Sequence, residues 1–304
     1  MQLLIRPPAL RPGDTVSIVA PASHLPHKKR GLLDAGIRRL ESHGLRVIYD
    51  RAILDEHLYL AGRDEVRARV LLDAFRNPEV RAIIGTRGGY GSQRILPLLD
   101  EDLIRAHPKI FIGSSDLTAI LIFMRTRCSL VTFYGPMVAS KQFNGENARA
   151  LLDTVQGLKT PVLTGEPLKP GHARGSLVGG CLTGLVHSLG TPYEVNLDGA
   201  ILLAEDVNEA PYRIDRMLTH LRNAGKLQGI RGAVFGHMPG CDLEGAQEGL
   251  LRRVILDAFK TTDIPILFGV SAGHGPLNIT IPLGVDAALD CTAGRLELDE
   301  PGVS

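Results

Sequence analysis

The first half of the chain alternates short apolar runs with longer amphipathic ones. Residues 15–23 (TVSIVAPAS) form an apolar run ending in small residues, which is typical of a buried strand, and residues 30–44 have the spacing of a helix that Gly44 ends. The alternation continues with strands predicted at 45–50, 81–86 and 109–113 and helical segments at 63–80, 92–107 and 116–127. This βα alternation predicts an α/β fold with a doubly wound, mostly parallel sheet in its N-terminal domain.

The pattern changes between about residues 154 and 175, where Gly, Pro and Thr replace helical periodicity. We therefore expect an N-terminal domain at 1–155, a linker at 156–174 and a smaller C-terminal α/β domain, rich in β-structure, at 175–304. Strands are predicted there at 199–206, 231–237 and 264–275, helices at 210–225 and 252–262, and a β-rich tail after them. The apolar residues of the first of these helices lie on one face, at Ile214, Met217, Leu218 and Leu221.

Composition and charge argue against several classes of partner and cofactor. The 304 residues carry 34 basic and 33 acidic side chains, a net charge of +1, so we expect no nucleic-acid partner. No apolar run approaches the ~18 residues of a membrane span, and no apolar signal segment opens the chain, so we expect a cytoplasmic protein with no membrane contact. The four cysteines form no CxxC pair and the histidines no His-x-x-x-His pair. We therefore expect buried thiols, no metal and no cofactor.

The stretch KIFIGSSDLTAI, residues 109–120, places Ser115 between a predicted strand and a predicted helix. A serine in this position can act as the nucleophile of a strand-turn-helix elbow. The usual G-x-S-x-G pattern is incomplete, because Leu117 replaces the second glycine. Ser114, Ser115 and Asp116 are also all favoured helix caps. From this segment alone, a capping role and a catalytic role both stay open.

A glycine-rich loop, GTRGGYGSQR at residues 85–94, follows another predicted strand. Its glycines allow close backbone approach, so it could cradle a phosphate or supply amides to an oxyanion. It matches neither G-x-G-x-x-G nor the P-loop pattern. A plain tight turn is an equally good interpretation.

Two more reactive groups follow apolar strands. Glu205 ends the strand ILLAE, and His274 lies in a glycine-rich turn after residues 264–273. In open α/β sheets, sites form at the carboxyl ends of strands. Ser115, Glu205 and His274 together have the composition of a nucleophile, an orienting acid and a general base.

The chain resembles the LD-carboxypeptidases, serine peptidases that include muropeptide L,D-carboxypeptidases and microcin C immunity peptidases. The similar stretches lie in the family's order over nearly the whole chain: residues 10–23, 59–100, 112–120 (IGSSDLTAI), 132–137 (TFYGPM), 202–218 (LLAEDVNEAPYRIDRML) and 273–284 (GHGPLNITIPLG). The resemblance implies hydrolysis of the bond before a C-terminal D-alanine in tetrapeptide muropeptides, during murein recycling. It also implies a homodimer.

The resemblance further implies a Ser-His-Glu triad. The serine before the aspartate of G-x-S-D falls on Ser115, the strand-end glutamate on Glu205, and the histidine of G-H-x-x-x-N on His274. The implied oxyanion hole uses the backbone amides of Gly88 or Gly89 and of Asp116. His274 is then expected to accept the Ser115 proton and pass it to the leaving amine.

Two departures separate this chain from the family pattern. Cys181 stands where Gly-Gly-Asn is common, and Ala204 precedes the acid where Leu is usual. Neither change removes a catalytic group, but Cys181 leaves substrate preference open. One alternative is therefore hydrolysis of a peptidyl-nucleotide or another acyl-amide conjugate, in immunity or detoxification. Another is a non-catalytic protein that binds an anionic ligand on the glycine loop.

Overall fold

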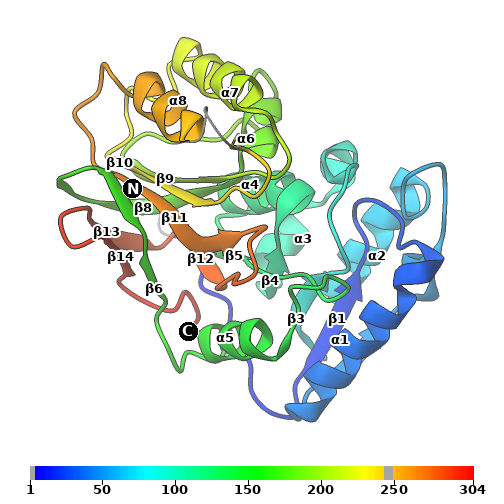
Figure 1. The fold of residues 1–304 in the computed structure, drawn as a ribbon. Coiled ribbons are helices and arrows are strands. Elements are labelled where there is room, and N and C mark those ends of the chain that lie inside the picture. Colours follow the sequence, from blue (N-terminus) through cyan, green and yellow to red (C-terminus); the bar gives the residue numbers. More distant parts are fainter. Residues whose placement is uncertain (1–3, 243–248) are drawn as a thin grey trace.

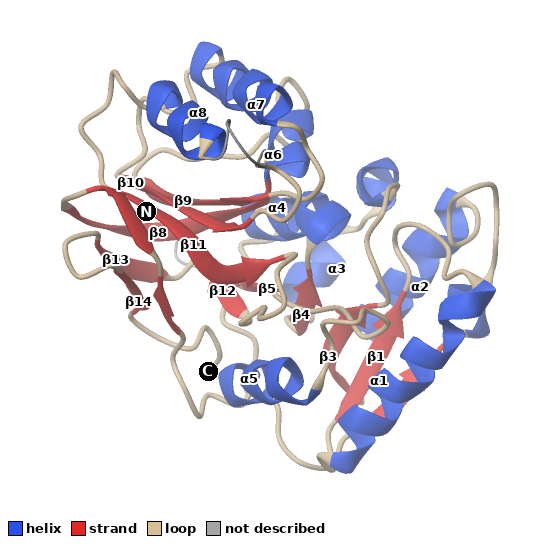
Figure 2. Ribbon diagram, in the orientation of Figure 1, coloured by secondary structure: helices blue, strands red, loops and turns tan. Residues whose placement is uncertain are grey.

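The computed structural model describes residues 4–242 and 249–304, and its strands form two sheets (Figures 1 and 2). The first sheet has the order β12-β5-β4-β3-β1-β2, and only β12 is antiparallel to its neighbour. Its strands are β1 (Thr15–Val19), β2 (Arg46–Tyr49), β3 (Val80–Gly85), β4 (Ile110–Gly113), β5 (Thr132–Tyr134) and β12 (Ile281–Leu283). The predicted parallel sheet is confirmed.

The helices of this half cover both faces of the sheet. They are α1 (Arg30–Ser42), α2 (Asp64–Arg76), α3 (Glu101–Ala106), α4 (Thr118–Arg127) and α5 (Gly145–Val155). Right-handed crossovers put α1 on one face and α2, α3 and α4 on the other, because the strand order reverses direction after β2. Contacts agree with this arrangement, since α1 packs on α5, α2 on α3 and α3 on α4 (Figure 1).

The second sheet has the order β6-β14-β13-β8-β9-β10-β11-β7, with β8 to β11 parallel. Helices α6 (Leu182–Ser188), α7 (Pro211–Asn223) and α8 (Leu250–Ala258) lie together along one side of it (Figure 2). The strands are β6 (Val162–Thr164), β7 (Glu166–Lys169), β8 (His172–Cys181), β9 (Ala200–Glu205), β10 (Gly232–His237), β11 (Ile266–Gly273), β13 (Asp286–Asp290) and β14 (Arg295–Leu298). The α/β fold with a β-rich C-terminal half is confirmed.

The segment expected as a linker contributes strands. Within 156–174, β6 pairs with β14 and β7 pairs with β11, so this stretch forms both edges of the second sheet. Short edge strands lack the long periodic pattern that makes a strand recognisable. In return, β12 from the C-terminal half joins the first sheet beside β5. The division at 155 remains our proposal, with β12 crossing it.

One other predicted segment differs from expectation. Residues 92–107 form a 3₁₀ segment over Ser92–Leu98, which contains Pro97, and only then the short helix α3. Proline interrupts the α-helical hydrogen bonds.

Within the described residues, none of the helices combines the length and apolar character needed to traverse a bilayer.

Candidate active site

In each sheet, the candidate residues lie at the carboxyl ends of parallel strands. In the first sheet, order β2-β1-β3-β4 puts the switch in winding direction between β1 and β3. The glycine loop follows β3, and Ser115 follows β4. Glu205 is the last residue of β9, and His274 follows β11 directly. All four positions are carboxyl ends of parallel strands, where α/β proteins form their sites.

Ser115 has a strained backbone. Its φ of 57° lies in the left-handed region, which non-glycine residues adopt at a cost of ~1–3 kcal/mol. A short 3₁₀ turn, Ser115–Leu117, then leads into α4. This strand-turn-helix geometry is that of a nucleophile elbow, although the closing glycine is absent.

The capping interpretation of this segment is wrong for Ser114. Ser114 is the N-cap residue of the 3₁₀ turn, yet its side chain makes no capping hydrogen bond. The Asp116 carboxylate instead accepts a hydrogen bond from the backbone N–H of Ser92, at 2.8 Å. The Ser92 hydroxyl donates to the backbone carbonyl of Asp116 at 2.5 Å. Asp116 therefore joins the glycine loop to the 3₁₀ turn Ser115–Leu117, which we call the serine turn. Burial raises the pKa of the Asp116 carboxyl group.

The glycine loop touches the serine turn at Gly88. A Cβ atom at Gly88 would lie 2.9 Å from Cβ and 3.0 Å from Oγ of Ser115, and 3.2 Å from the amide nitrogen of Asp116. Only a residue without a side chain permits this approach. Gly89 turns away, because a Cβ atom there would overlap the Ser23 side chain. Of the two glycines expected at an oxyanion hole, Gly88 is the one beside Ser115.

Glu205 and His274 form a buried pair. The Glu205 side chain is 0% exposed, and its Oε2 accepts hydrogen bonds from Nδ1 of His274 at 2.6 Å and from the His274 backbone N–H at 3.1 Å. Gly273 makes this approach possible, because a side chain there would overlap the Glu205 carboxylate. Nδ1 thus donates to the acid, which leaves Nε2 to accept a proton.

Two opposing effects set the pKa of His274. Burial acts to lower it, while the hydrogen bond and the charge of Glu205, with the charge of Asp206, raise it. The net shift is upward from the usual 6.5. Glu205 therefore stabilises the imidazolium form, as the acid of a catalytic triad does.

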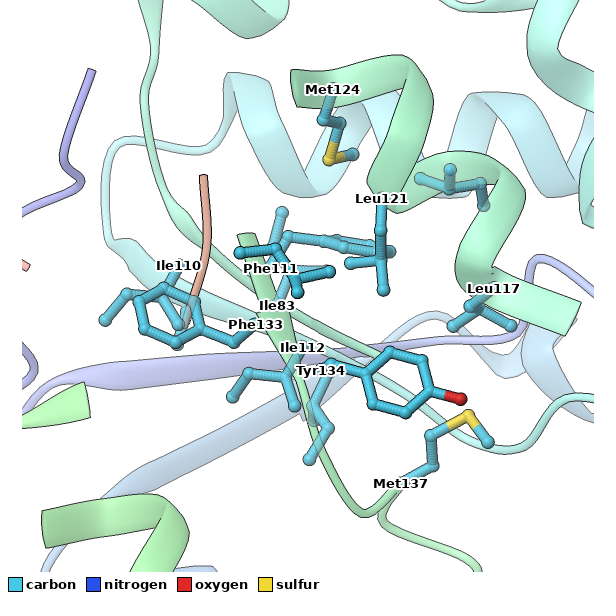
Figure 3. Close-up of a cluster of buried hydrophobic side chains, with 14 of the residues drawn as sticks. Ile83, Ile110, Phe111, Ile112, Leu117, Leu121, Met124, Phe133, Tyr134 and Met137 are labelled. Carbon is cyan, nitrogen blue, oxygen red and sulfur yellow. The ribbon is translucent and has the colours of Figure 1, made fainter. Parts of the chain in front are cut away.

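Tyr134, for which the sequence alone predicted no role, connects the two halves of the site. The Tyr134 hydroxyl donates to Oε1 of Glu205 and accepts from the Ser115 backbone N–H at 3.1 Å. Figure 3 shows its ring within the apolar cluster of the first sheet, with the hydroxyl directed away from Phe111 and Phe133. Burial raises the pKa of Tyr134, so the hydroxyl stays a donor. The sequence signal that could have indicated a role for Tyr134 is its position just before a turn in the stretch TFYGPM.

A second set of polar residues, also missed, holds the turn that carries His274. The Gln142 side chain donates to the carbonyls of Gly273, at 2.9 Å, and Gly275. Asn147 donates to the Pro276 carbonyl, and the Asn278 side chain accepts from the Gly273 N–H, both at 3.1 Å. Buried amide side chains that satisfy backbone groups fix a turn's geometry.

Cys181, one of the two departures from the family resemblance, is buried. Its thiol donates to Oδ2 of Asp206 at 3.6 Å, and burial raises the pKa of the thiol well above its usual range. The same carboxylate oxygen accepts from the N–H and hydroxyl of Thr183, at 2.9 and 2.8 Å. Cys181 is therefore a neutral group. It lies beside β9, the strand that ends in Glu205, and its thiol faces Asp206.

Comparison with known proteins identifies the family. Residues 16–135 match the model for the LD-carboxypeptidase N-terminal domain, and residues 174–289 match the LD-carboxypeptidase C-terminal domain. The chain belongs to the LD-carboxypeptidase family. A probable murein peptide carboxypeptidase of Bacillus subtilis is 38% identical over 308 residues, covering 98% of this chain and 95% of the relative. The chain is accordingly a serine-type carboxypeptidase.

Solved structures agree on the fold. The muramoyltetrapeptide carboxypeptidase from Oxalobacter formigenes has a TM-score of 0.82 at 29% identity, covering 93% of this chain and 97% of that one. The microcin C7 self-immunity protein MccF has a TM-score of 0.92 at 22% identity, covering 99% and 100%. The same architecture thus occurs in proteins named for two different activities.

Proposed function

We propose that this LD-carboxypeptidase hydrolyses the L,D-peptide bond before the C-terminal D-alanine of tetrapeptide muropeptides, with Ser115, His274 and Glu205 as its catalytic triad. The observation that carries the proposal is the fully buried Glu205 bonded to Nδ1 of His274 at 2.6 Å, one tyrosine hydroxyl away from the strained Ser115. The murein and muramoyltetrapeptide names of similar proteins support the substrate class.

In this mechanism, Ser115 Oγ attacks the carbonyl carbon before the terminal residue while Nε2 of His274 takes its proton. The amides of Gly88 and Asp116 stabilise the oxyanion, because such donors bind the tetrahedral intermediate more strongly than the ground state. The Ser115 N–H already donates to the Tyr134 hydroxyl, so the next N–H, that of Asp116, is the one that binds the oxyanion. His274 then protonates the leaving amine of D-alanine, and water releases the acyl-enzyme by the reverse proton transfers.

The test is D-alanine release from a disaccharide-tetrapeptide and from the free tetrapeptide. Wild-type protein is expected to release D-alanine from both, and Ser115→Ala from neither. Ser114→Ala is the matched control, since it removes the adjacent hydroxyl and is expected to keep at least about half of the activity. A tetrapeptide ending in L-alanine should be left intact. Full activity of Ser115→Ala would disprove the triad.

One feature favours the alternative substrate, a peptidyl-nucleotide conjugate. The rings of Tyr59 and Tyr90 are each about half exposed, with centroids 5.7 Å apart, beside the glycine loop. Exposed aromatic rings can stack on nucleobases. Cleavage of an aspartyl-adenylate analogue, with no D-alanine release from muropeptides, would establish this function instead.

We also propose a cytoplasmic homodimer acting in murein recycling. The family resemblance supports both points, and the four cysteines are unpaired, as a reducing compartment requires. Light scattering on the purified protein and fractionation of the source cells test them. A monomer, or a protein found outside the cytoplasm, would contradict the respective point.

A further inference from the structure

A carboxypeptidase must recognise the free carboxylate at the end of its substrate. In the proposed reaction, that carboxylate carbon lies three bonds beyond the carbonyl carbon that Ser115 attacks. The site therefore needs a cationic donor about one residue length, or 3.8 Å, from the reacting atoms. None of the triad or oxyanion groups supplies such a charge. The inference below rests on the proposed function, whose triad leaves this requirement unmet.

Arg87 is the cationic residue next to the reacting groups in the chain. It lies in the glycine loop, at the carboxyl end of β3, and directly precedes Gly88, the glycine that contacts Ser115. It also sits at the switch point between β1 and β3, where open α/β sheets form their binding crevice. A Cβ atom on Gly89 would lie 3.4 Å from Nη2 of Arg87, so the guanidinium group turns back over the loop.

The charge of Arg87 is not neutralised by the protein. Nη1 donates to the backbone carbonyl of His24 at 2.9 Å, and within residues 4–242 and 249–304 no carboxylate lies at ion-pair distance. The nearby Glu56 faces the His24 ring, at 3.6 Å, instead. The side chain is half-buried, and this burial lowers the pKa of its guanidinium group. A partly desolvated charge without a counter-ion is costly, and a bound carboxylate offsets that cost.

Other arginines near the loop are already paired. Arg67 is buried and bonded to Asp64, and Arg94 binds the same carboxylate at 2.8 Å. Both therefore support the loop rather than a ligand. Arg125 also forms no ion pair within residues 4–242 and 249–304. It lies toward the far end of α4, ~10 Å along the helix from Thr118, the first residue of that helix. Arg87 is thus the arginine at the site with donors to spare.

The surroundings of Arg87 hold it in place. The Ser23 hydroxyl accepts from the backbone N–H of Tyr90 at 3.0 Å and donates to the Tyr90 carbonyl at 3.3 Å. These bonds tie the loop after β1, which supplies the His24 carbonyl, to the glycine loop. A preorganised guanidinium group binds a carboxylate bidentately with little loss of side-chain entropy.

We propose that Arg87 binds the C-terminal carboxylate of the substrate and so restricts this enzyme to removal of a terminal residue. Nε and Nη2, which no described residue engages, present two parallel donors to the two carboxylate oxygens. The glycine loop then has two functions on two adjacent residues. Gly88 supplies the oxyanion amide, and Arg87 fixes the leaving D-amino acid.

The experiment compares a tetrapeptide ending in D-alanine with the same peptide ending in D-alanine amide. Wild type is expected to prefer the carboxylate about 100-fold in kcat/KM, and Arg87→Gln to lose that preference by losing about 100-fold on the carboxylate substrate alone. Arg87→Lys should keep part of the preference, because a lysine retains the charge without the fork. Arg38→Gln, on the exposed face of α1, is the control for loss of one arginine.

The two substrates separate the possible failures. Unchanged preference in Arg87→Gln, or an equal loss on both peptides, would overturn the role of Arg87 while the triad stands. Equal cleavage of both peptides by wild type would overturn carboxylate recognition altogether. If wild type releases no D-alanine from the carboxylate peptide, the proposed function fails, and the role of Arg87 fails with it.

Discussion

The two halves of the candidate site are held by different physical means. Ser115 lies in a strained left-handed turn between β4 and a short 3₁₀ segment, with Gly88 close by and a single hydrogen bond from its N–H to Tyr134. Glu205 and His274 are fixed by a buried charge and by side chains that reach them from distant parts of the chain. Backbone strain therefore distinguishes the nucleophile half, whereas the acid-base half depends on hydrogen bonds between residues far apart in the chain.

This difference predicts which substitutions lower activity alone and which lower both activity and the stability of the fold. Strain at the nucleophile costs stability and can be relieved without harm to the fold. The buried acid, by contrast, stabilises the fold only while its partners remain, because an unpaired buried charge is costly. Changes on the first half should therefore lower activity and spare the fold, while changes on the second should lower both.

The largest effect is expected at the nucleophile. Ser115→Ala should lower kcat by roughly 10⁴- to 10⁶-fold with little change in the free energy of unfolding. Ser115→Gly should lower kcat equally but raise the free energy of unfolding by ~1 kcal/mol over Ser115→Ala, because glycine adopts a φ of 57° without strain. Urea denaturation of both variants measures this. Equal stability would show that the turn is not strained.

The acid should be nearly as important for activity. Glu205→Gln is expected to lower kcat by ~10⁴-fold, since the amide no longer stabilises the protonated His274. It should also shift the NMR titration of the His274 ring to lower pH, because the charge and hydrogen bond that raise the pKa of His274 are lost. An unshifted titration would contradict the pairing of these two side chains.

Gly88→Ala tests the contact between the glycine loop and the nucleophile. The added methyl group would lie 3.0 Å from Ser115 Oγ, so we expect a loss of about 100-fold or more in kcat/KM from displaced reacting groups. Gly31→Ala is the matched control, because among the described residues no atom from outside its own stretch of helix lies within 4 Å of a Cβ atom there. Wild-type activity in Gly88→Ala would place the loop away from the serine.

Tyr134→Phe tests the link between the two halves. Removing the hydroxyl leaves Oε1 of Glu205 and the Ser115 N–H without their partner, which should cost ~1–3 kcal/mol of stability. We expect kcat to fall by about 10- to 100-fold with KM nearly constant, since Tyr134 acts through Glu205 and the serine turn. Thermal denaturation and steady-state kinetics measure the two effects. Unchanged kcat would mean that the halves are positioned independently.

The smallest effect is a pH dependence of stability. The pKa of His274 is raised above its unfolded value of 6.5, so its contribution is fully present below pH 6.5 and is lost as pH rises through the folded pKa. The difference in free energy of unfolding between wild type and His274→Gln should therefore be larger at pH 5.5 than at pH 8.5. A difference that grows with pH would reverse the assigned sign.

The sequence predicted the local half of this site better than the long-range half. Ser115 could be placed because an apolar strand and a helix flank it within twelve residues. Its strained φ was not foreseeable, since G-x-S-x-G was incomplete. Glu205 and His274 could be placed at strand ends, but not their distance, which depends on the pairing of β9, β10 and β11.

The residues that support the catalytic side chains could not be predicted from sequence patterns. Gln142 contacts Gly273 across 131 positions of sequence, and Tyr134 contacts Glu205 across 71. No periodicity or spacing encodes such contacts. The same is true of β6 and β7, three and four residues long, whose place at the sheet edges is set by their partners. Long periodic segments such as α1 and α7, in contrast, were predicted to within two residues.

The central claim is that Ser115 of one sheet and the Glu205 and His274 pair of the other form one catalytic unit. The most direct test is covalent labelling with an active-site-directed fluorophosphonate, followed by peptide mass spectrometry. The account predicts a single adduct on Ser115 in wild type, at least about 100-fold slower labelling in His274→Gln, and none in Ser115→Ala. An adduct on Ser114, or labelling of Ser115 at the wild-type rate in His274→Gln, would contradict it.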